Sequence, residues 1–451
     1  MLDLSCRKSA LCLVVGTLVL LAPGVARAQG WLADRERAEG PGFRVGNLEL
    51  HPGVGVEAGY DSNVFLEEEN TSSSAILRTT AHLMLSTLGQ ERREEGEAER
   101  DEEQPRGGKV AFRGGLNFSH YHFFATPVRD NVGGDLSLDL AINPNGPFTV
   151  RIYDTLGRTV RPFTDRAGDA RLKWGRNFNR AGIDFALGSK SGVLRGNLGY
   201  AIDLDFFDEQ TFRYANSLTH RVNAGADWKF LPSTALLYRL NIRYRDYFDF
   251  SASDSPSLLS DTLRVDTEIG VNGAITNTFS VAALIGYSAG FYENENLPNY
   301  EAPNGRVELR WRPRQTVRTS LGYQRDFRAS FVGNTVQRNR IYAQAQITML
   351  GALLLAPEAS VTFAETDAAL STEPGEPFLG NRRFRESIRM RLQLFGEYRV
   401  TNWLALNATV AYSADFTDYE FTEDVVMGGV LPDPGAAWRK FEVFGGVRIF
   451  Y

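Results

Sequence analysis

Cysteine is nearly absent from this sequence, since Cys6 and Cys12 are the only two in 451 residues. Both lie in an N-terminal segment in which two basic residues precede the apolar run 10–25, and a small-residue triplet, Ala-Arg-Ala, follows it. This pattern predicts a secretory signal peptide over residues 1–28. Because its removal would take both cysteines away, we expect the mature chain to have neither a disulfide bond nor a thiolate metal ligand.

Long apolar runs are also missing downstream of that segment. No stretch reaches the roughly 18 consecutive apolar residues that suggest a membrane-spanning helix. Apolar residues spaced with the helical period of about 3.6 are nearly absent as well. We therefore predict neither a transmembrane helix nor a helical domain in the mature chain.

Lysine is scarce, because six lysines stand against 43 arginines. Residues 1–28 carry three basic and one acidic side chain, so the mature chain would hold 46 basic and 54 acidic residues, a net charge of −8. An acidic balance of this size argues against nucleic acid as a partner.

The sequence has instead a repeated alternation of apolar and polar side chains. Residues 236–248, LLYRLNIRYRDYF, place arginines on one side and leucine, isoleucine and tyrosine on the other. Residues 262–271, 305–313 and 387–395 repeat the pattern. Successive side chains of a strand point to opposite faces, so each segment is predicted to be a strand with one apolar and one polar face.

The spacing between these segments favours a barrel over a soluble sandwich. Short turns are expected at 143–147, 189–192, 231–234, 276–278, 312–315 and 400–402, and they alternate with longer polar loops that include 249–260, 293–304, 366–381 and 423–435. Short turns on one rim and long loops on the other are typical of bacterial outer-membrane barrels. We therefore predict an all-β fold, a transmembrane antiparallel outer-membrane β-barrel of about 18 strands over residues 48–451, preceded by a periplasmic segment at 29–47.

In a barrel of this size, the arginines of the alternating segments would line a wet lumen while Leu236, Leu240 and Ile242 face lipid. The candidate lumen contacts are Arg239, Arg243, Arg245, Arg306, Arg310, Arg318, Arg389 and Arg391. A guanidinium can bind carboxylates and hydroxyl-rich chains through paired hydrogen bonds. Two interpretations stay open: these arginines contact a passing cargo, or they form a structural network with inward carboxylates such as Glu308.

The final segment, KFEVFGGVRIFY, alternates in the same way and ends on an aromatic residue. Its apolar face comprises Phe441, Val443, Val447, Ile449 and Tyr451. This arrangement resembles the C-terminal assembly signal of outer-membrane barrels, which is presented to the barrel assembly machinery. The resemblance implies insertion into the outer membrane of a Gram-negative cell.

A second resemblance comes from residues 48–65, LELHPGVGVEAGYDSNVF, in which the first strand runs into Tyr60, Asp-Ser-Asn and an apolar pair. This segment resembles the start of the β-barrel porins of the porin-2 type, which are associated with exopolysaccharide synthesis and export. The resemblance implies a channel for exopolysaccharide secretion, with polysaccharide as cargo and outer-membrane lipid around the barrel. The alternative is a general diffusion porin for small solutes.

Residues 89–108 form a charged run with eight carboxylates and four arginines, on the side of the short turns. Runs of this composition are usually solvated turns, because they cannot bury enough apolar surface to offset the entropy of ordering. The other interpretation is a periplasmic contact for a polysaccharide export protein.

Two motifs suggest other chemistry. The segment 286–290, GYSAG, matches the nucleophile-elbow pattern around Ser288, but it lies inside a predicted strand, and all five histidines precede it. A barrel hydrolase with another residue order is the remaining enzymatic alternative. His120 and His122 share one strand face without an evident third ligand, so a polar or rim position is favoured over a metal site. We predict no catalytic residue, cofactor or metal.

Overall fold

The computed structural model describes residues 42–46, 48–87, 109–125, 130–159, 175–189, 192–208, 213, 215–248, 259–295, 299–329, 335–367, 384–418 and 436–451. The predicted signal peptide and the charged run at 89–108 lie outside these residues, as does most of the predicted segment 29–47. No helix in the described part of the chain is long and apolar enough to cross a membrane.

The described chain forms 19 strands. They are β1 (Phe43–Val45), β2 (Leu48–Asp61), β3 (Ser74–Thr87), β4 (Val110–Phe123), β5 (Asn131–Ile142), β6 (Phe148–Thr159), β7 (Arg176–Gly188), β8 (Leu194–Phe207), β9 (Ser217–Leu231), β10 (Thr234–Tyr247), β11 (Thr262–Ala274), β12 (Phe279–Tyr292), β13 (Tyr300–Arg314), β14 (Val317–Ala329), β15 (Thr335–Met349), β16 (Leu353–Asp367), β17 (Phe384–Arg399), β18 (Leu404–Phe416) and β19 (Trp438–Phe450).

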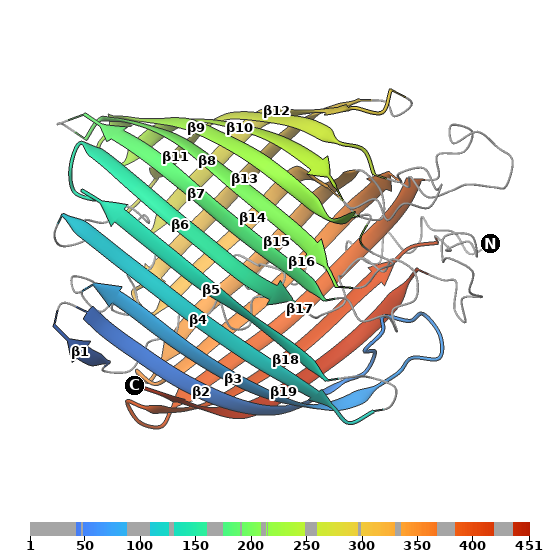
Figure 1. Ribbon diagram of the computed structural model, residues 1–451. Coiled ribbons are helices and arrows are strands. Elements are labelled where there is room, and N and C mark those ends of the chain that lie inside the picture. Colours follow the sequence, from blue (N-terminus) through green and yellow to red (C-terminus); the bar gives the residue numbers. More distant parts are fainter. Residues whose placement is uncertain are drawn as a thin grey trace, which may run out of the picture.

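Strands β2 to β19 close into one antiparallel barrel of 18 strands (Figure 1). Each strand pairs with its neighbours in sequence, and β19 pairs with β2, where Glu442 lies opposite Asp61 and Phe450 opposite Gly53. Because β19 pairs with β2, the sheet has no first or last edge strand, and the backbone groups of the paired residues are satisfied without water. The predicted all-β barrel of about 18 strands is confirmed.

The short strand β1 lies outside this count. It pairs with the beginning of β2, where Phe43 is opposite Leu50. The ladder between β2 and β19 starts only at Gly53, and the Tyr451 N–H donates to the carbonyl oxygen of Pro52 at 2.9 Å. Strand β1 therefore pairs with the beginning of β2, on the same side as β19 and beyond the point where β19 ends.

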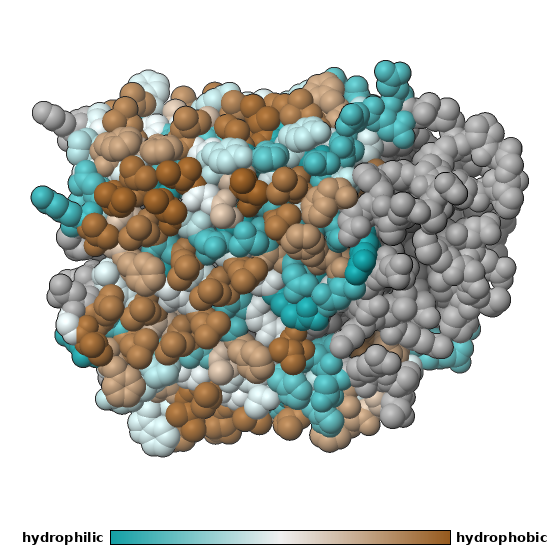
Figure 2. Space-filling view, in the orientation of Figure 1, coloured by the Kyte–Doolittle hydropathy of each residue, from teal (hydrophilic) through white to brown (hydrophobic). Residues whose placement is uncertain are grey.

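The two faces of the wall differ in chemistry. Leu236, Tyr238, Leu240, Ile242 and Tyr244 alternate along β10 with the arginines, as predicted, and Tyr238 and Tyr244 are 44% and 42% exposed. Large apolar side chains are exposed on most strands, and Figure 2 shows them spread over the outer surface. An apolar exterior on a closed barrel matches a hydrocarbon environment rather than water.

Aromatic residues form two exposed groups near the ends of the barrel. Towards the short turns, these are Phe148, Phe185, Trp228, Phe230, Trp311, Tyr398 and Trp403. Towards the long loops, they include Tyr60, Phe206, Tyr244, Tyr287, Phe291 and Phe441. Girdles of this kind lie at the two interfaces of an outer-membrane barrel, where ring bodies contact lipid and polar tips contact water.

Short turns join β5 to β6, β9 to β10, β11 to β12, β13 to β14, β15 to β16 and β17 to β18, all on one rim. Residue 451 and strand β1 lie at this rim, and the connections on the opposite rim are mostly longer. Short turns mark the periplasmic side of such barrels. The protein is therefore a multi-pass β-barrel of the outer membrane, with β1 and Tyr451 at its periplasmic rim.

Candidate channel lining

The eight predicted lumen arginines lie on one face of the barrel wall. Residues directly opposite in a ladder share a face, and a continuous path of such pairs links all eight through strands β10 to β17. The pairs along this path include Arg239 with Glu268, Arg310 with Ser320, Arg318 with Gln346, and Arg391 with Ser360. This face is opposite to that of the exposed apolar residues, so it is the lumen face. Contact of the eight arginines with a cargo stays a prediction.

Three of these arginines pair closely with carboxylates. Arg239 Nη1 lies 2.5 Å from Asp227 Oδ1, and Arg310 Nε lies 2.6 Å from Glu308 Oε1. Arg389 Nε lies 3.0 Å from the fully buried carboxylate of Asp415. These contacts belong to the structural network, the second of the two interpretations.

Others have neutral partners. Arg245 donates to Thr219 Oγ1 at 3.1 Å and to the Tyr247 hydroxyl at 3.4 Å. Arg391 donates to Gln393 Oε1 at 2.7 Å. A guanidinium carries five N–H donors, so these contacts occupy only part of its hydrogen-bonding capacity.

Several polar contacts join strands that are not adjacent in the wall. Arg448 on β19 reaches across β18 to Glu397 on β17 at 2.7 Å, and Tyr342 on β15 donates across β14 to Glu308 at 2.5 Å. Asn407 on β18 donates across β19 to Glu57 at 2.9 Å. Inward-pointing side chains converge on the concave side of a barrel, which allows contacts of this reach. The sequence shows which face these residues share but not that they meet.

The wall departs from a regular cylinder where β13 meets β14. Their ladder ends at the pair Gly305 and Arg325, although β13 continues to Tyr300 alongside β12 and β14 continues to Ala329 alongside β15. Pro303 lies just beyond this point and has no N–H to donate to a neighbouring strand. Its carbonyl accepts instead from Arg325 Nε at 2.9 Å.

Beyond that point, the β14–β15 hairpin turns towards the lumen. Phe327 shares its strand face with the outward residue Tyr323, which is 43% exposed, yet Phe327 is only 5% exposed. Its ring stacks on that of Tyr300, a lumen-face residue of β13, with centroids 5.3 Å apart. Thr335, on the outer face of β15, likewise contacts the hydroxyl of Tyr292, a lumen-face residue of β12. We call residues 326–329 and 335–338 the in-bent hairpin.

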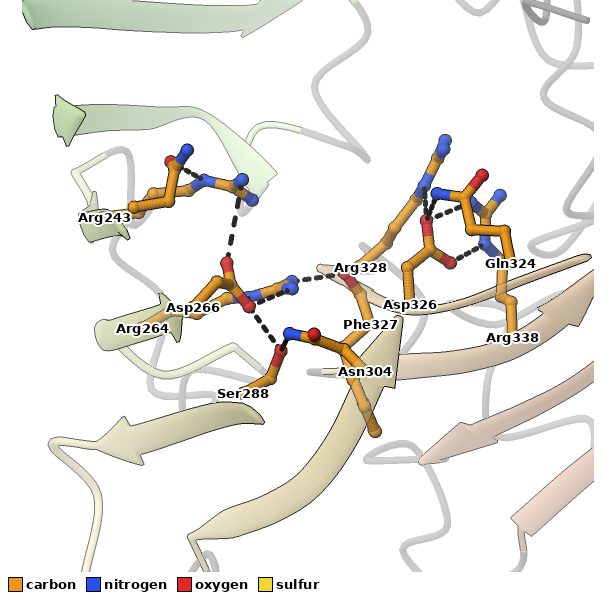
Figure 3. Close-up of polar contacts among 11 residues, drawn as sticks. Arg243, Arg264, Asp266, Ser288, Asn304, Gln324, Asp326, Phe327, Arg328 and Arg338 are labelled. Atoms are coloured by element: carbon orange, nitrogen blue, oxygen red, sulfur yellow. Dashed lines mark hydrogen bonds and ion pairs between the residues drawn. The ribbon is translucent and has the colours of Figure 1, made fainter. Parts of the chain in front are cut away.

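A polar cluster holds the in-bent hairpin against the lumen face of β11, β12 and β13 (Figure 3). Arg264 on β11 donates through Nη1 to the carbonyl oxygen of Phe327 on β14, and through Nε and Nη2 to Asp266 at 3.0 and 2.7 Å. Asp266 also accepts from Ser288 Oγ at 2.5 Å, and Ser288 Oγ accepts from Asn304 at 2.6 Å. This chain of contacts ties four strands together.

A second cluster lies on the in-bent hairpin itself. Arg338 donates to both oxygens of Asp326, at 2.9 and 2.7 Å, which is the paired geometry that a guanidinium favours. Arg328 approaches the same carboxylate through Nε at 3.3 Å, and Gln324 donates to it at 3.1 Å. One carboxylate is thus shared by two arginines.

In the described residues, Ser288 and the histidine pair contact polar side chains of the protein itself. Ser288 is fully buried within the continuous strand β12, without the strand–turn–helix that a nucleophile elbow needs. His120 and His122 lie at the long-loop end of β4, on the outer face, and both approach Asp130, the second at 2.8 Å. The contact with His122 lowers the pKa of Asp130. No group of three ligating side chains suited to a metal is found among the described residues.

The predicted assembly-signal residues share the outer face of β19. Phe441, Val443, Val447, Ile449 and Tyr451 are 43%, 37%, 41%, 47% and 42% exposed. Phe450, between the last two, points into the lumen and is 2% exposed, with the Arg448 guanidinium 4.2 Å from its ring centroid. The face is therefore available to lipid, and recognition by assembly machinery stays a prediction.

No family model and no curated protein matches this sequence. Among solved structures, the chain is similar to the FrpB iron transporter from Neisseria meningitidis (10% identity, 89% of this chain and 81% of that chain, TM-score 0.46). It is also similar to an anion-selective porin from Comamonas acidovorans (11%, 90% and 99%, 0.37) and to the outer membrane protein opdK from Pseudomonas aeruginosa (9%, 89% and 99%, 0.43). At this level of similarity, the conclusions about fold and location rest on the strand pairing and the two faces of the wall.

Proposed function

We propose that this protein is a passive channel through which hydrophilic solutes cross the outer membrane. The observation that carries the proposal is the wall itself, a closed barrel of 18 strands with an apolar exterior and a lumen face rich in arginine, aspartate, glutamate and serine. Barrels with about 16–18 strands leave an aqueous channel, whereas small barrels fill their interior with side chains. A charged lumen favours polar solutes over lipid-soluble ones.

Exopolysaccharide is the second candidate cargo. Its support is the resemblance of residues 48–65 to porins associated with exopolysaccharide export, together with an exposed arginine–aromatic pair on the lumen face. Arg151, whose side chain is 44% exposed, lies over the Tyr153 ring with 5.2 Å to its centroid. Aromatic faces and guanidinium forks are both suited to sugar rings that bear hydroxyl and carboxylate groups.

Liposome swelling tests whether the barrel conducts solutes at all. Vesicles containing the purified full-length protein should swell in glucose and in a disaccharide at rates that fall with solute size. Equal swelling with and without the protein would contradict the channel proposal. In the cell, deletion of the gene should leave exopolysaccharide on the surface unchanged if the barrel is a general porin, and should reduce it if polysaccharide is the cargo.

A further inference from the structure

Four arginines gather at the in-bent hairpin, in the extracellular part of the lumen. Arg243 and Arg264 come from β10 and β11, and Arg328 and Arg338 come from the hairpin (Figure 3). The carboxylates that they contact in the described residues are Asp266 and Asp326. The cluster therefore has two more guanidiniums than carboxylates.

Two of the four arginines are satisfied by the protein. Arg264 is held by Asp266 and by the Phe327 carbonyl, and its side chain is 12% exposed. Arg338 is paired with both oxygens of Asp326 and is 18% exposed. These two side chains hold the hairpin in place.

The other two are held loosely. Arg243 donates through Nε to Asn241 at 3.1 Å, and its Nη2 lies 3.7 Å from Asp266 Oδ2. Arg328 contacts Asp326 only through Nε at 3.3 Å, and its side chain is 56% exposed. Within the described residues, terminal N–H groups of both guanidiniums therefore remain available for an acceptor.

We propose that Arg243 and Arg328 form a carboxylate-binding constriction at the in-bent hairpin, and that the hydrogen bond from Arg264 to the Phe327 carbonyl keeps this hairpin inside the lumen. This inference rests on the proposed channel function and names its preferred solute class, sugars or other hydrophilic molecules that carry a carboxylate. A guanidinium fork matches the two oxygens of a carboxylate. Two loosely held guanidiniums can bind a passing anion and release it again, because conduction requires that the solute is bound weakly enough to leave.

Planar-bilayer recording of the purified full-length barrel tests this inference. The probes are a KCl gradient for ion selectivity, and glucuronate against glucose for current block, because these two sugars differ in a carboxylate. The test variant is Arg243→Gln/Arg328→Gln, which removes both charges and keeps polar side chains. The matched control is Arg318→Gln, on the lumen face near the periplasmic end of β14, the strand that carries Arg328.

We expect the wild-type channel to prefer anions and to be blocked by glucuronate more strongly than by glucose. The double variant should lower the anion-to-cation permeability ratio and the glucuronate block at least about twofold, while Arg318→Gln changes both much less. Arg264→Met should raise conductance and reduce the block by releasing the hairpin. Heat-modifiable migration of each variant shows whether its barrel has folded.

The outcomes separate this inference from the channel proposal. A barrel that conducts no current contradicts the channel proposal itself. A conducting barrel whose selectivity and block are the same in wild type and in the double variant overturns the constriction alone. An equal effect of Arg318→Gln overturns it as well, because the preference would then belong to the whole lumen. Stronger block by a short oligogalacturonate than by glucuronate assigns the bound carboxylate to a polysaccharide chain, and equal block assigns it to small solutes.

Discussion

The ring of Phe43 lies stacked on the ring of Tyr451, with centroids 4.2 Å apart and planes inclined by 30°. Phe43 belongs to β1, which pairs with β2 at the seam where β19 ends. Phe43 thus covers one side of the aromatic ring that completes the predicted assembly signal. The contact can form only after β1 and β2 have met the end of β19, so it marks a closed barrel.

The first prediction concerns this contact. Phe43→Ala should destabilise the folded barrel by about 0.5–1.5 kcal/mol, the usual value of an aromatic pair beyond its buried area. Urea unfolding of the barrel in lipid vesicles measures the change. Val45→Ala is the control, because Val45 is on the same strand and 69% exposed. Equal stability of wild type and Phe43→Ala would show that the stacking contributes nothing.

A second prediction separates assembly from packing at the C-terminus. Deleting Phe450 and Tyr451 together would remove a lumen-facing ring beneath Arg448 as well as the outward aromatic residue. Tyr451→Ala alone should therefore lower the amount of outer-membrane protein while the purified barrel keeps its heat-modifiable migration. Unchanged abundance in the membrane would contradict the predicted role of Tyr451 in assembly.

The third prediction concerns the ion pair between Arg448 and Glu397, which are 2% and 4% exposed. Arg448→Met should lower the free energy of unfolding by about 3–5 kcal/mol, because it leaves a buried carboxylate without its cation. Arg448→Met combined with Glu397→Leu should recover much of this loss. A double variant less stable than the single one would refute the explanation by an uncompensated charge.

The fourth prediction separates arginines that pair with a buried carboxylate from those that contact a neutral side chain. Arg310→Gln should cost about 1–3 kcal/mol of stability, because Glu308 is buried and would lose its hydrogen-bonded cation. Arg391→Gln should change stability little, since Arg391 donates to the neutral Gln393 in the described residues. Equal losses of stability in urea unfolding would place Arg391 in the same network.

The alternation of side chains predicted the strands, the two faces and the number of strands, because a period of two residues depends only on local geometry and on the solvent at each face. It also placed Arg239, Arg243 and the other candidate arginines on the lumen face. The in-bent hairpin was not predicted, because alternation assigns Phe327 to the lipid side. The ladder between β13 and β14 ends at Gly305, two residues after Pro303, and beyond this end Phe327 stacks on the lumen-face residue Tyr300. Pro303 is the one sequence signal that could have indicated it.

The pairing of arginines could not be predicted either. Contacts such as Arg448 with Glu397, or Arg264 with the carbonyl of Phe327, join strands that are not neighbours. They depend on the curvature of the closed wall, which a strand-by-strand reading of the sequence does not contain.

Single-channel recording of the purified, refolded wild-type barrel in a planar bilayer tests the central claim most directly. An aqueous channel predicts discrete current steps whose conductance rises with KCl concentration, and heat-unfolded protein should give none. A barrel that inserts, shows heat-modifiable migration and yet produces no current steps would contradict the account, because its lumen would then be closed to ions and to every hydrophilic solute.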